Sequence, residues 1–130
     1  MTRTVAVGYA TEEMETVYNT VLKAQTAAIE ATKSGMTGKE IDTVARQIID
    51  EAGYGSYFGH GYGHCLGMEV HEAPNSNPGG SVVMEPGMVS SAEPGIYLPG
   101  KFGVRIEDVV IFTADGCENI TKSPKNLIII

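Results

Sequence analysis

The chain has 130 residues, the size of one domain, and 42% of them are hydrophobic, so neither a disordered nor a fibrous protein is expected. Its 16 acidic residues outnumber its 9 basic ones, and the net charge of −7 argues against nucleic acid or an anionic membrane as a partner. No apolar stretch is long enough to span a bilayer, no signal-peptide pattern is seen, and two cysteines are too few for a disulfide framework, so we expect a cytoplasmic domain.

The first half of the chain is expected to be mainly helical. Residues 2–8 alternate and are rich in β-branched side chains, which predicts a strand. Thr11 then caps a helix with an acidic first turn, and apolar residues follow at helical spacing until Gly35 ends it. Thr37 and Glu40 have the spacing of a capping box for a second helix, which a further glycine ends. Both helices carry an apolar stripe, so we expect them to lie on a sheet without carrying chemistry.

The second half is expected to consist of short strands and turns, because thirteen of the 16 glycines and all six prolines lie from Gly53 onward. The residues Ala-Asp-Gly at 114–116 predict a hairpin turn with a positive φ at its glycine. The predicted class is α+β, a mostly antiparallel sheet with two helices on one face, in a single domain over residues 1–130. Four segments are expected to form strands: residues 66–72, 88–98, 104–113 and 117–122.

All three histidines lie in one glycine-rich segment, residues 58–72, which also holds four glycines. His60 and His64 are four residues apart, which on a helix would give one metal-binding face. The glycines beside and between them disfavour a helix and favour unusual backbone torsions or the close approach of a ligand. A glycine-rich turn with partly exposed histidines is the alternative, and this segment does not rank His60, His64 and His71 as ligands.

Two carboxylates further along the chain are candidate partners for these histidines. Glu93 precedes a proline, which favours an extended backbone, and within a strand it would share a face with Ser91. The alternative is an exposed glutamate at the end of a strand.

Charged residues also alternate along the strand expected at 104–113. Arg105 and Glu107 take one face and Asp108 the other. A carboxylate covered there needs Arg105 or a metal as its partner, because burying it alone costs several kcal/mol. A structural salt bridge from Arg105 to Glu107 or Asp108 is the alternative. One imidazole and two carboxylates from separate strands would suit Mn²⁺, Co²⁺, Fe²⁺ or Zn²⁺.

Four blocks of the sequence resemble the Xaa-Pro aminopeptidases and prolidases, which are metallopeptidases with the pita-bread fold. The blocks occur in the family's order and extend over nearly the whole chain. The resemblance implies half of a pita-bread fold and hydrolysis of the peptide bond before proline in proline-containing peptides. The blocks are HGYGHCLGMEVHE (60–72), EPGIY (93–97), GVRIEDVV (103–110) and ITKSPKNLIII (120–130).

The resemblance also implies a site for two divalent metal ions. His64 and Glu93 correspond to ligands of one ion, and Glu107 corresponds to a carboxylate that bridges both. We expect Mn²⁺ or Co²⁺, with Zn²⁺ or Fe²⁺ as alternatives. In this scheme a hydroxide between the ions attacks the carbonyl, and Glu93 handles its proton.

Other residues are assigned to the substrate by the same resemblance. His60 and His71 correspond to histidines that contact substrate or move protons. Arg105 corresponds to an arginine that supports the bridging carboxylate. Two further expectations do not come from the resemblance. Tyr62, among the glycines of this segment, is expected to line the substrate pocket. Cys65, where the family often has glycine, is expected to be a buried structural thiol, with competition for soft metals as the alternative.

The sequence departs from the family pattern at its start. The family's other two ligands are aspartates, the second lying directly before a strand that resembles residues 1–8. Asp42 and Asp50 lie in the second predicted helix and cannot replace them. We therefore expect the C-terminal part of a catalytic domain, binding at most one metal ion loosely and having little or no activity alone. An uncovered sheet edge would favour a homo-oligomer or pairing with an N-terminal half.

Two other functions are compatible with the same resemblance. One is a peptide-binding module that has lost its metals, and the other is a metal-free, creatinase-like C–N hydrolase. The presence of His64, Glu93 and Glu107 together disfavours both, because neither function requires all three side chains.

Overall fold

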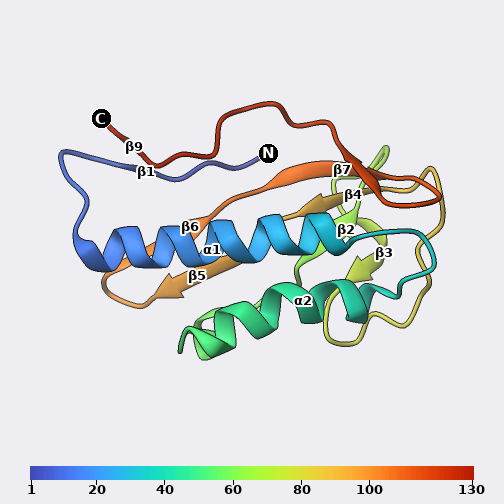
Figure 1. The fold of residues 1–130 in the computed structure, drawn as a ribbon, viewed down its shortest axis with the longest axis horizontal. Coiled ribbons are helices and arrows are strands. Elements are labelled where there is room, and N and C mark those ends of the chain that lie inside the picture. Colours follow the sequence, from blue (N-terminus) through green and yellow to red (C-terminus); the bar gives the residue numbers. More distant parts are fainter.

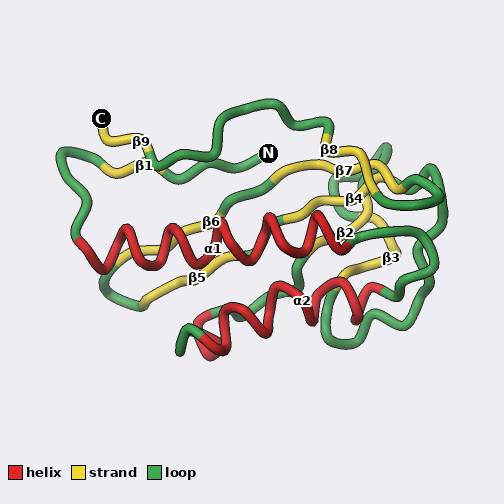
Figure 2. The backbone as a smooth tube through the Cα atoms, in the orientation of Figure 1, coloured by secondary structure: helices red, strands yellow, loops and turns green.

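The computed structural model describes all 130 residues and contains two long helices in its first half. Figure 1 shows α1 and α2 lying across one side of the strands. Figure 2 shows that the chain after α2 consists of strands and loops, apart from one short 3₁₀ turn. The elements are β1 (Val5–Ala6), α1 (Glu12–Ala31), α2 (Gly38–Glu51), the 3₁₀ turn η1 (Gly55–Tyr57), β2 (Gly63–Cys65), β3 (Glu72–Ser76), β4 (Val89–Ala92), β5 (Gly95–Leu98), β6 (Phe102–Arg105), β7 (Asp108–Phe112), β8 (Cys117–Asn119) and β9 (Ile128–Ile129).

Both helices begin as their sequences predict. The Thr11 hydroxyl accepts the Met14 N–H at 3.2 Å, and Thr37 and Glu40 form both bonds of a capping box. The helix α2 ends at Glu51, and its C-cap Ala52 is followed by Gly53, whose φ is +84°. The helix α1 ends at Ala31, four residues before the Gly35 that was expected to end it, because Thr32 takes an extended backbone there. No helix is both long and apolar enough to cross a membrane.

The strands form one antiparallel sheet and two smaller ribbons. The five-stranded sheet has the order β3-β2-β4-β7-β8, and every pair in it is antiparallel. Strands β5 and β6 form a hairpin, and β1 pairs with β9 in parallel near the two chain ends (Figure 1). The predicted α+β class, with a mostly antiparallel sheet and two helices on one face, is confirmed.

Several predicted strands are shorter than expected. Residues 66–71 form a turn and not a strand, because the Glu69 N–H bonds to the Glu72 carboxylate at 2.9 Å and so is used locally. The segments 88–98 and 104–113 each divide into two strands. The first division falls at Glu93 and Pro94, and the second at residues 106 and 107, where Glu107 pairs with Thr2.

Two further strand predictions need correction. Within residues 2–8 only β1 is a strand, and of residues 117–122 only β8 is. The hairpin turn at 114–116 is confirmed by the pairing of Phe112 with Cys117. Gly116, however, is not among the glycines with positive φ, so that part of the prediction is wrong. The Thr113 N–H bonds to the Gly116 carbonyl at 2.9 Å, which closes the turn without a left-handed residue.

The core lies between the helices and the strands. The apolar stripes of α1 and α2 pack against each other, and α1 also packs on β4, β5, β6 and β8. This leaves the strand ends around residues 60–64 and 93 to form the site. Fully buried members of the core include Val17, Val21, Ile41, Ile49, Met84, Ile96 and Ile106.

Candidate metal centre

The glycine-rich segment borders a polar pocket of ≈ 520 Å³ that holds all three histidines. No hydrophobic residue lines it, whereas pockets for small organic ligands are mostly apolar. It therefore suits an ion and polar groups. Its lining residues are His60, Gly61, Gly63, His64, His71, Asn75, Asn77, Glu93 and Arg105.

His64 presents one defined ring nitrogen to this pocket. It lies on β2, where its backbone N–H donates to the Ser91 hydroxyl at 3.0 Å. Its Nδ1 is 3.0 Å from the Cys65 carbonyl oxygen, and because a carbonyl only accepts, Nδ1 must carry the proton. Its Nε2 lies 2.9 Å from Glu93 Oε1. Metal-binding histidines typically give one N–H to a carbonyl while the other nitrogen takes the metal, and here that other nitrogen faces the Glu93 carboxylate.

Glu93 is fixed between β4 and β5. Its backbone N–H donates to the Tyr62 carbonyl at 2.8 Å, and its Oε1 accepts the Ser91 hydroxyl at 2.9 Å. The prediction that Ser91 shares a face with Glu93 is confirmed. Ser91 is 1% exposed, and its hydroxyl binds both the His64 backbone and the Glu93 carboxylate. It therefore sets the spacing of the two predicted ligands.

His71 lies beside His64 on the exposed turn that precedes β3. The two ring centroids are 4.3 Å apart and the ring planes are tilted by 54°. Asn75 and Asn77, two residues apart after this turn, also line the pocket. The sequence reasoning missed both asparagines, although their spacing of two residues, with Asn75 in β3 and Asn77 directly after it, was a signal that they share one face.

His60 is held by a tyrosine that sequence reasoning also missed. Its Nδ1 is 2.8 Å from the Gly61 carbonyl, so Nδ1 is the protonated nitrogen, and its Nε2 is 2.9 Å from the Tyr97 hydroxyl. Tyr97 ends the EPGIY block, four residues after Glu93, which was the available signal. Burial raises the pKa of Tyr97, while the neighbouring Arg105 guanidinium acts to lower that pKa.

Glu107, the third predicted ligand, has other partners. Its carboxylate accepts the Thr2 hydroxyl and lies 3.5 Å from the Met1 ammonium group. It is not among the residues that line the pocket. No group of three or more His, Cys, Asp and Glu side chains is close enough to hold a metal ion. The structure thus brings together two of the three predicted ligands, His64 and Glu93.

Arg105 lines the pocket but makes no ion pair, so the alternative of a structural salt bridge from Arg105 to Glu107 or Asp108 is not borne out. Asp108 is the covered carboxylate of this segment and is 0% exposed. Arg3 and Lys125 contact it at 2.7 and 2.6 Å, and Asn119 donates to it at 2.6 Å. Burial alone would raise the pKa of Asp108, but these three bonds outweigh it and lower that pKa.

Two residues of the glycine-rich segment belong to the core. Tyr62 is 2% exposed and its hydroxyl points to the Gln25 carbonyl at 3.4 Å, so the prediction that it lines the substrate pocket is wrong. Its backbone serves the site through the bond to Glu93. Cys65 is buried, as expected, and burial raises the pKa of its thiol.

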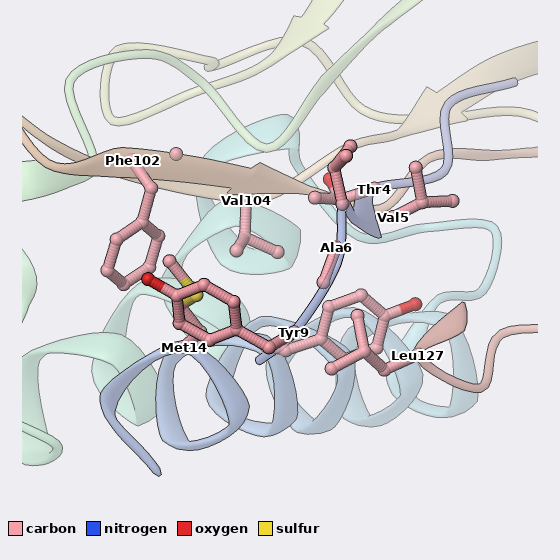
Figure 3. A pocket seen from close by; sticks show the side chains of 11 residues that line it. Thr4, Val5, Ala6, Tyr9, Met14, Phe102, Val104 and Leu127 are labelled. Carbon is pink, nitrogen blue, oxygen red and sulfur yellow. The ribbon is translucent and has the colours of Figure 1, made fainter. Parts of the chain in front are cut away.

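A second cavity of ≈ 230 Å³ shares no residue with the polar pocket. In Figure 3 its wall is formed by side chains from β1, the start of α1 and β6, together with Leu127. Nine of its 11 lining residues are hydrophobic, so it offers no ligand set for a cation.

The donors that meet in the polar pocket fit a divalent transition metal. A histidine ring nitrogen and a carboxylate oxygen face each other at 2.9 Å, and both His64 and Glu93 are oriented by further hydrogen bonds. Glu107 fits by donor type, but its Oε2 accepts the Thr2 hydroxyl and the residue does not line the pocket. Two donors alone hold such an ion weakly, because structural and catalytic sites use three or four protein ligands.

A sequence model of metallopeptidase family M24 matches residues 1–114. The chain belongs to this metallopeptidase family. Among curated M24 relatives, the Xaa-Pro dipeptidase of Pyrococcus furiosus is 48% identical over 128 residues, covering 98% of this chain and 37% of the relative. The Xaa-Pro dipeptidase of Lactobacillus delbrueckii subsp. lactis is 54% identical over 125 residues, covering 96% of this chain and 34% of the relative.

Solved structures of an Xaa-Pro dipeptidase and a prolidase have the same fold as this chain over nearly its whole length. An Xaa-Pro dipeptidase from Bacillus anthracis superimposes with a TM-score of 0.97 at 52% identity, covering 98% of this chain and 36% of that chain. The prolidase from Pyrococcus furiosus gives a TM-score of 0.92 at 48% identity, covering 94% and 36%. The resemblance drawn from the four sequence blocks and the pita-bread fold are confirmed. The chain spans about a third of the length of the curated relatives it matches.

Proposed function

We propose that this M24 chain forms part of the metal centre of a peptidase that cleaves Xaa-Pro bonds. The observation that carries the proposal is the pairing of His64 Nε2 with Glu93 Oε1 at 2.9 Å in a pocket that no hydrophobic residue lines. The relatives named Xaa-Pro dipeptidase support the substrate class, proline-containing peptides. Mn²⁺ or Co²⁺ is the proposed metal, with Zn²⁺ or Fe²⁺ as alternatives.

In this proposal His64, Glu93 and Glu107 would hold the metal. A bound divalent ion would polarise the scissile carbonyl and lower the pKa of water. The Ser91 hydroxyl and the Tyr62 carbonyl orient Glu93, so that its second oxygen is available to accept a proton.

The remaining pocket residues would act on the substrate. His71, exposed beside His64, would contact the peptide. His60 keeps its proton on Nδ1 and shares the Tyr97 proton at Nε2, which forms a short path for moving a proton. Arg105 would supply positive charge to a developing oxyanion or to a peptide carboxylate.

We further propose that this chain alone binds at most one ion, loosely, and has little or no peptidase activity. The support is that only two ligands meet in the pocket and that the relatives are about three times as long. A complete centre would form when the chain pairs with an N-terminal half that supplies more carboxylates, or with another copy of itself.

A metal-free peptide-binding module is the second candidate. The observation that favours it is the lack of a three-ligand group, together with a pocket lined by two asparagines and an arginine that suit a peptide backbone and a carboxylate. In this case proline-containing peptides would bind equally well with and without metal.

Calorimetric titration with Mn²⁺ separates these functions. The unmodified chain is expected to bind one ion weakly, and His64→Ala and Glu93→Gln are expected to abolish this binding. Glu118→Gln, which removes an exposed carboxylate on β8, is the matched control and is expected to bind as the unmodified chain does. Tight binding of two ions per chain, or binding that survives both ligand variants, would contradict the proposal.

Activity is tested by co-expression with the N-terminal half of an M24 relative. Hydrolysis of an Xaa-Pro dipeptide is expected to appear in the mixture and to disappear with Glu107→Gln. Activity that persists in Glu107→Gln would exclude the bridging role of this carboxylate.

A further inference from the structure

The helix α2 carries a buried ion pair that faces the glycine-rich segment. Asp42 and Arg46 are one turn apart, with side chains 1% and 23% exposed. Arg46 Nε donates to Asp42 Oδ2 at 2.7 Å and Arg46 Nη2 donates to Oδ1 at 3.0 Å, which makes the pair bidentate. Neither residue lines the polar pocket or fits any role assigned so far.

The remaining bonds of this pair all go to residues 58–62. Arg46 donates to the Phe58 carbonyl at 3.0 Å and to the His60 carbonyl at 2.8 Å, and its guanidinium stacks 4.2 Å above the Phe58 ring. Asp42 Oδ1 accepts the Tyr62 N–H at 2.9 Å. One ion pair therefore binds the backbone of every second residue from Phe58 to Tyr62. These bonds are additional to those that hold Asp42 and Arg46 together.

The segment needs such restraint because Gly59 and Gly61 flank His60. Glycine has the largest conformational freedom to lose, so a segment with two of them does not by itself hold a side chain in place. With the backbone bound to α2, the Phe58 ring packs edge-on to the His60 ring at 5.2 Å and 87°. The same backbone places the Gly61 carbonyl 2.8 Å from His60 Nδ1, which fixes the proton there and leaves Nε2 to the Tyr97 hydroxyl.

We propose that Asp42 and Arg46 are positioning residues that hold residues 58–62 so that His60 keeps its proton on Nδ1 and its Nε2 against the Tyr97 hydroxyl. The catalytic value of that arrangement rests on the proposed function, whereas the positioning itself does not. The expectation that the helices carry no chemistry is thereby revised for α2: Asp42 is not a metal ligand, but through Arg46 it acts on a pocket histidine.

The test is the nitrogen NMR spectrum of the His60 ring in the full chain, without metal or peptide. Long-range ¹H–¹⁵N correlation distinguishes a protonated ring nitrogen from an unprotonated one, and the His60→Gln spectrum assigns the signals. The unmodified chain is expected to show Nδ1 protonated and Nε2 unprotonated. In Arg46→Lys a single ammonium cannot replace the four guanidinium bonds, so the His60 signals are expected to move to a tautomer mixture with protonated Nε2.

Arg3→Lys is the matched control. Like Arg46, Arg3 forms an ion pair with a buried aspartate, Asp108, and donates to backbone carbonyls. None of its bonds reaches residues 58–62. Its substitution is expected to lower stability and leave the His60 signals unchanged. Asp42→Asn is the second variant: it keeps the shape of the side chain but turns an amide toward the Arg46 donors, and the same change at His60 is expected.

Each outcome decides the proposal. A folded Arg46→Lys or Asp42→Asn with the His60 signals of the unmodified chain would overturn it, as would a protonated Nε2 in the unmodified chain. If neither variant folds, the pair supports the whole domain and not this segment in particular, and the proposal is overturned as well. Because no metal or peptide enters the measurement, a failed Mn²⁺ titration would refute the proposed function and leave this result standing.

Discussion

Replacing Gly63 with alanine tests how closely β2 approaches β4 at the candidate metal centre. Gly63 is the first residue of β2 and lies against the Ser91 backbone. A Cβ at this position would be 2.9 Å from the Ser91 carbonyl carbon and 3.1 Å from the Ser91 hydroxyl, and closer still to the carbonyl oxygen. The colliding atoms are mainly backbone, so no rotamer change at residue 91 relieves the contact.

The size of the effect follows from these distances. The contact with the Ser91 carbonyl oxygen is the shortest and sets the shift: to bring it to an ordinary contact distance the strands must separate by roughly 1 Å. That shift takes the 3.0 Å bond from the His64 N–H to the Ser91 hydroxyl beyond the usual hydrogen-bond range. Overpacking costs about 1–3 kcal/mol and a lost hydrogen bond about 1 kcal/mol, so we expect Gly63→Ala to cost roughly 2–4 kcal/mol.

Urea unfolding of the full chain measures this cost. With a slope of about 2 kcal/mol/M, the midpoint is expected to fall by roughly 1–2 M. Gly59→Ala is the matched control, because a Cβ there meets no atom within 4 Å and the φ of Gly59 is not positive. It is expected to stay within about 0.5 kcal/mol of the unmodified chain. Equal midpoints for the two alanine variants would refute the close approach of β2 to Ser91, and with it the spacing of His64 and Glu93.

Two further predictions concern groups outside the pocket. Asp108→Asn is expected to lower the free energy of unfolding by about 3 kcal/mol, because Lys125 then faces a neutral amide. Arg3 keeps its bonds to backbone carbonyls in this variant. A urea midpoint unchanged from the unmodified chain would contradict this prediction. Burial raises the pKa of the Cys117 thiol. In a Cys65→Ser background, the reaction of Cys117 with a disulfide reagent should therefore begin at a higher pH in the folded chain than in the urea-unfolded chain. Coinciding pH profiles of the two reactions would contradict the buried environment.

The helices were predictable from sequence because their signals are local. The capping residues Thr11 and Thr37 each bond within three residues of themselves, and the apolar stripe repeats within a few turns. The strands were less predictable, since the turn at residues 66–71 is set by one bond from Glu69 to Glu72. Runs of β-favouring residues do not reveal where such a bond interrupts the extended chain.

The candidate site was predictable only in part, for the same reason. The residue types His64 and Glu93 stood out as ligands, but their distance depends on Ser91, which is 27 positions from His64. Likewise Tyr97 is 37 positions from His60, and its hydroxyl could not be assigned to that ring before the fold was known. Glu107 shows the limit of residue type alone, because its carboxylate engages Thr2 and not the histidines.

The pocket is held from two sides by independent means, and this independence can be tested. His64 and Glu93 are spaced by the contact of β2 with β4 through Ser91, whereas His60 is held through residues 58–62 by α2. The two sets of bonds share only the Tyr62 backbone, which gives its N–H to Asp42 and its carbonyl to Glu93. Gly63→Ala should therefore leave the tautomer of His60 unchanged while it lowers stability. A change of the His60 signals in that variant would mean that the glycine-rich segment moves as one unit, with the Tyr62 peptide groups transmitting the displacement from β2 to α2.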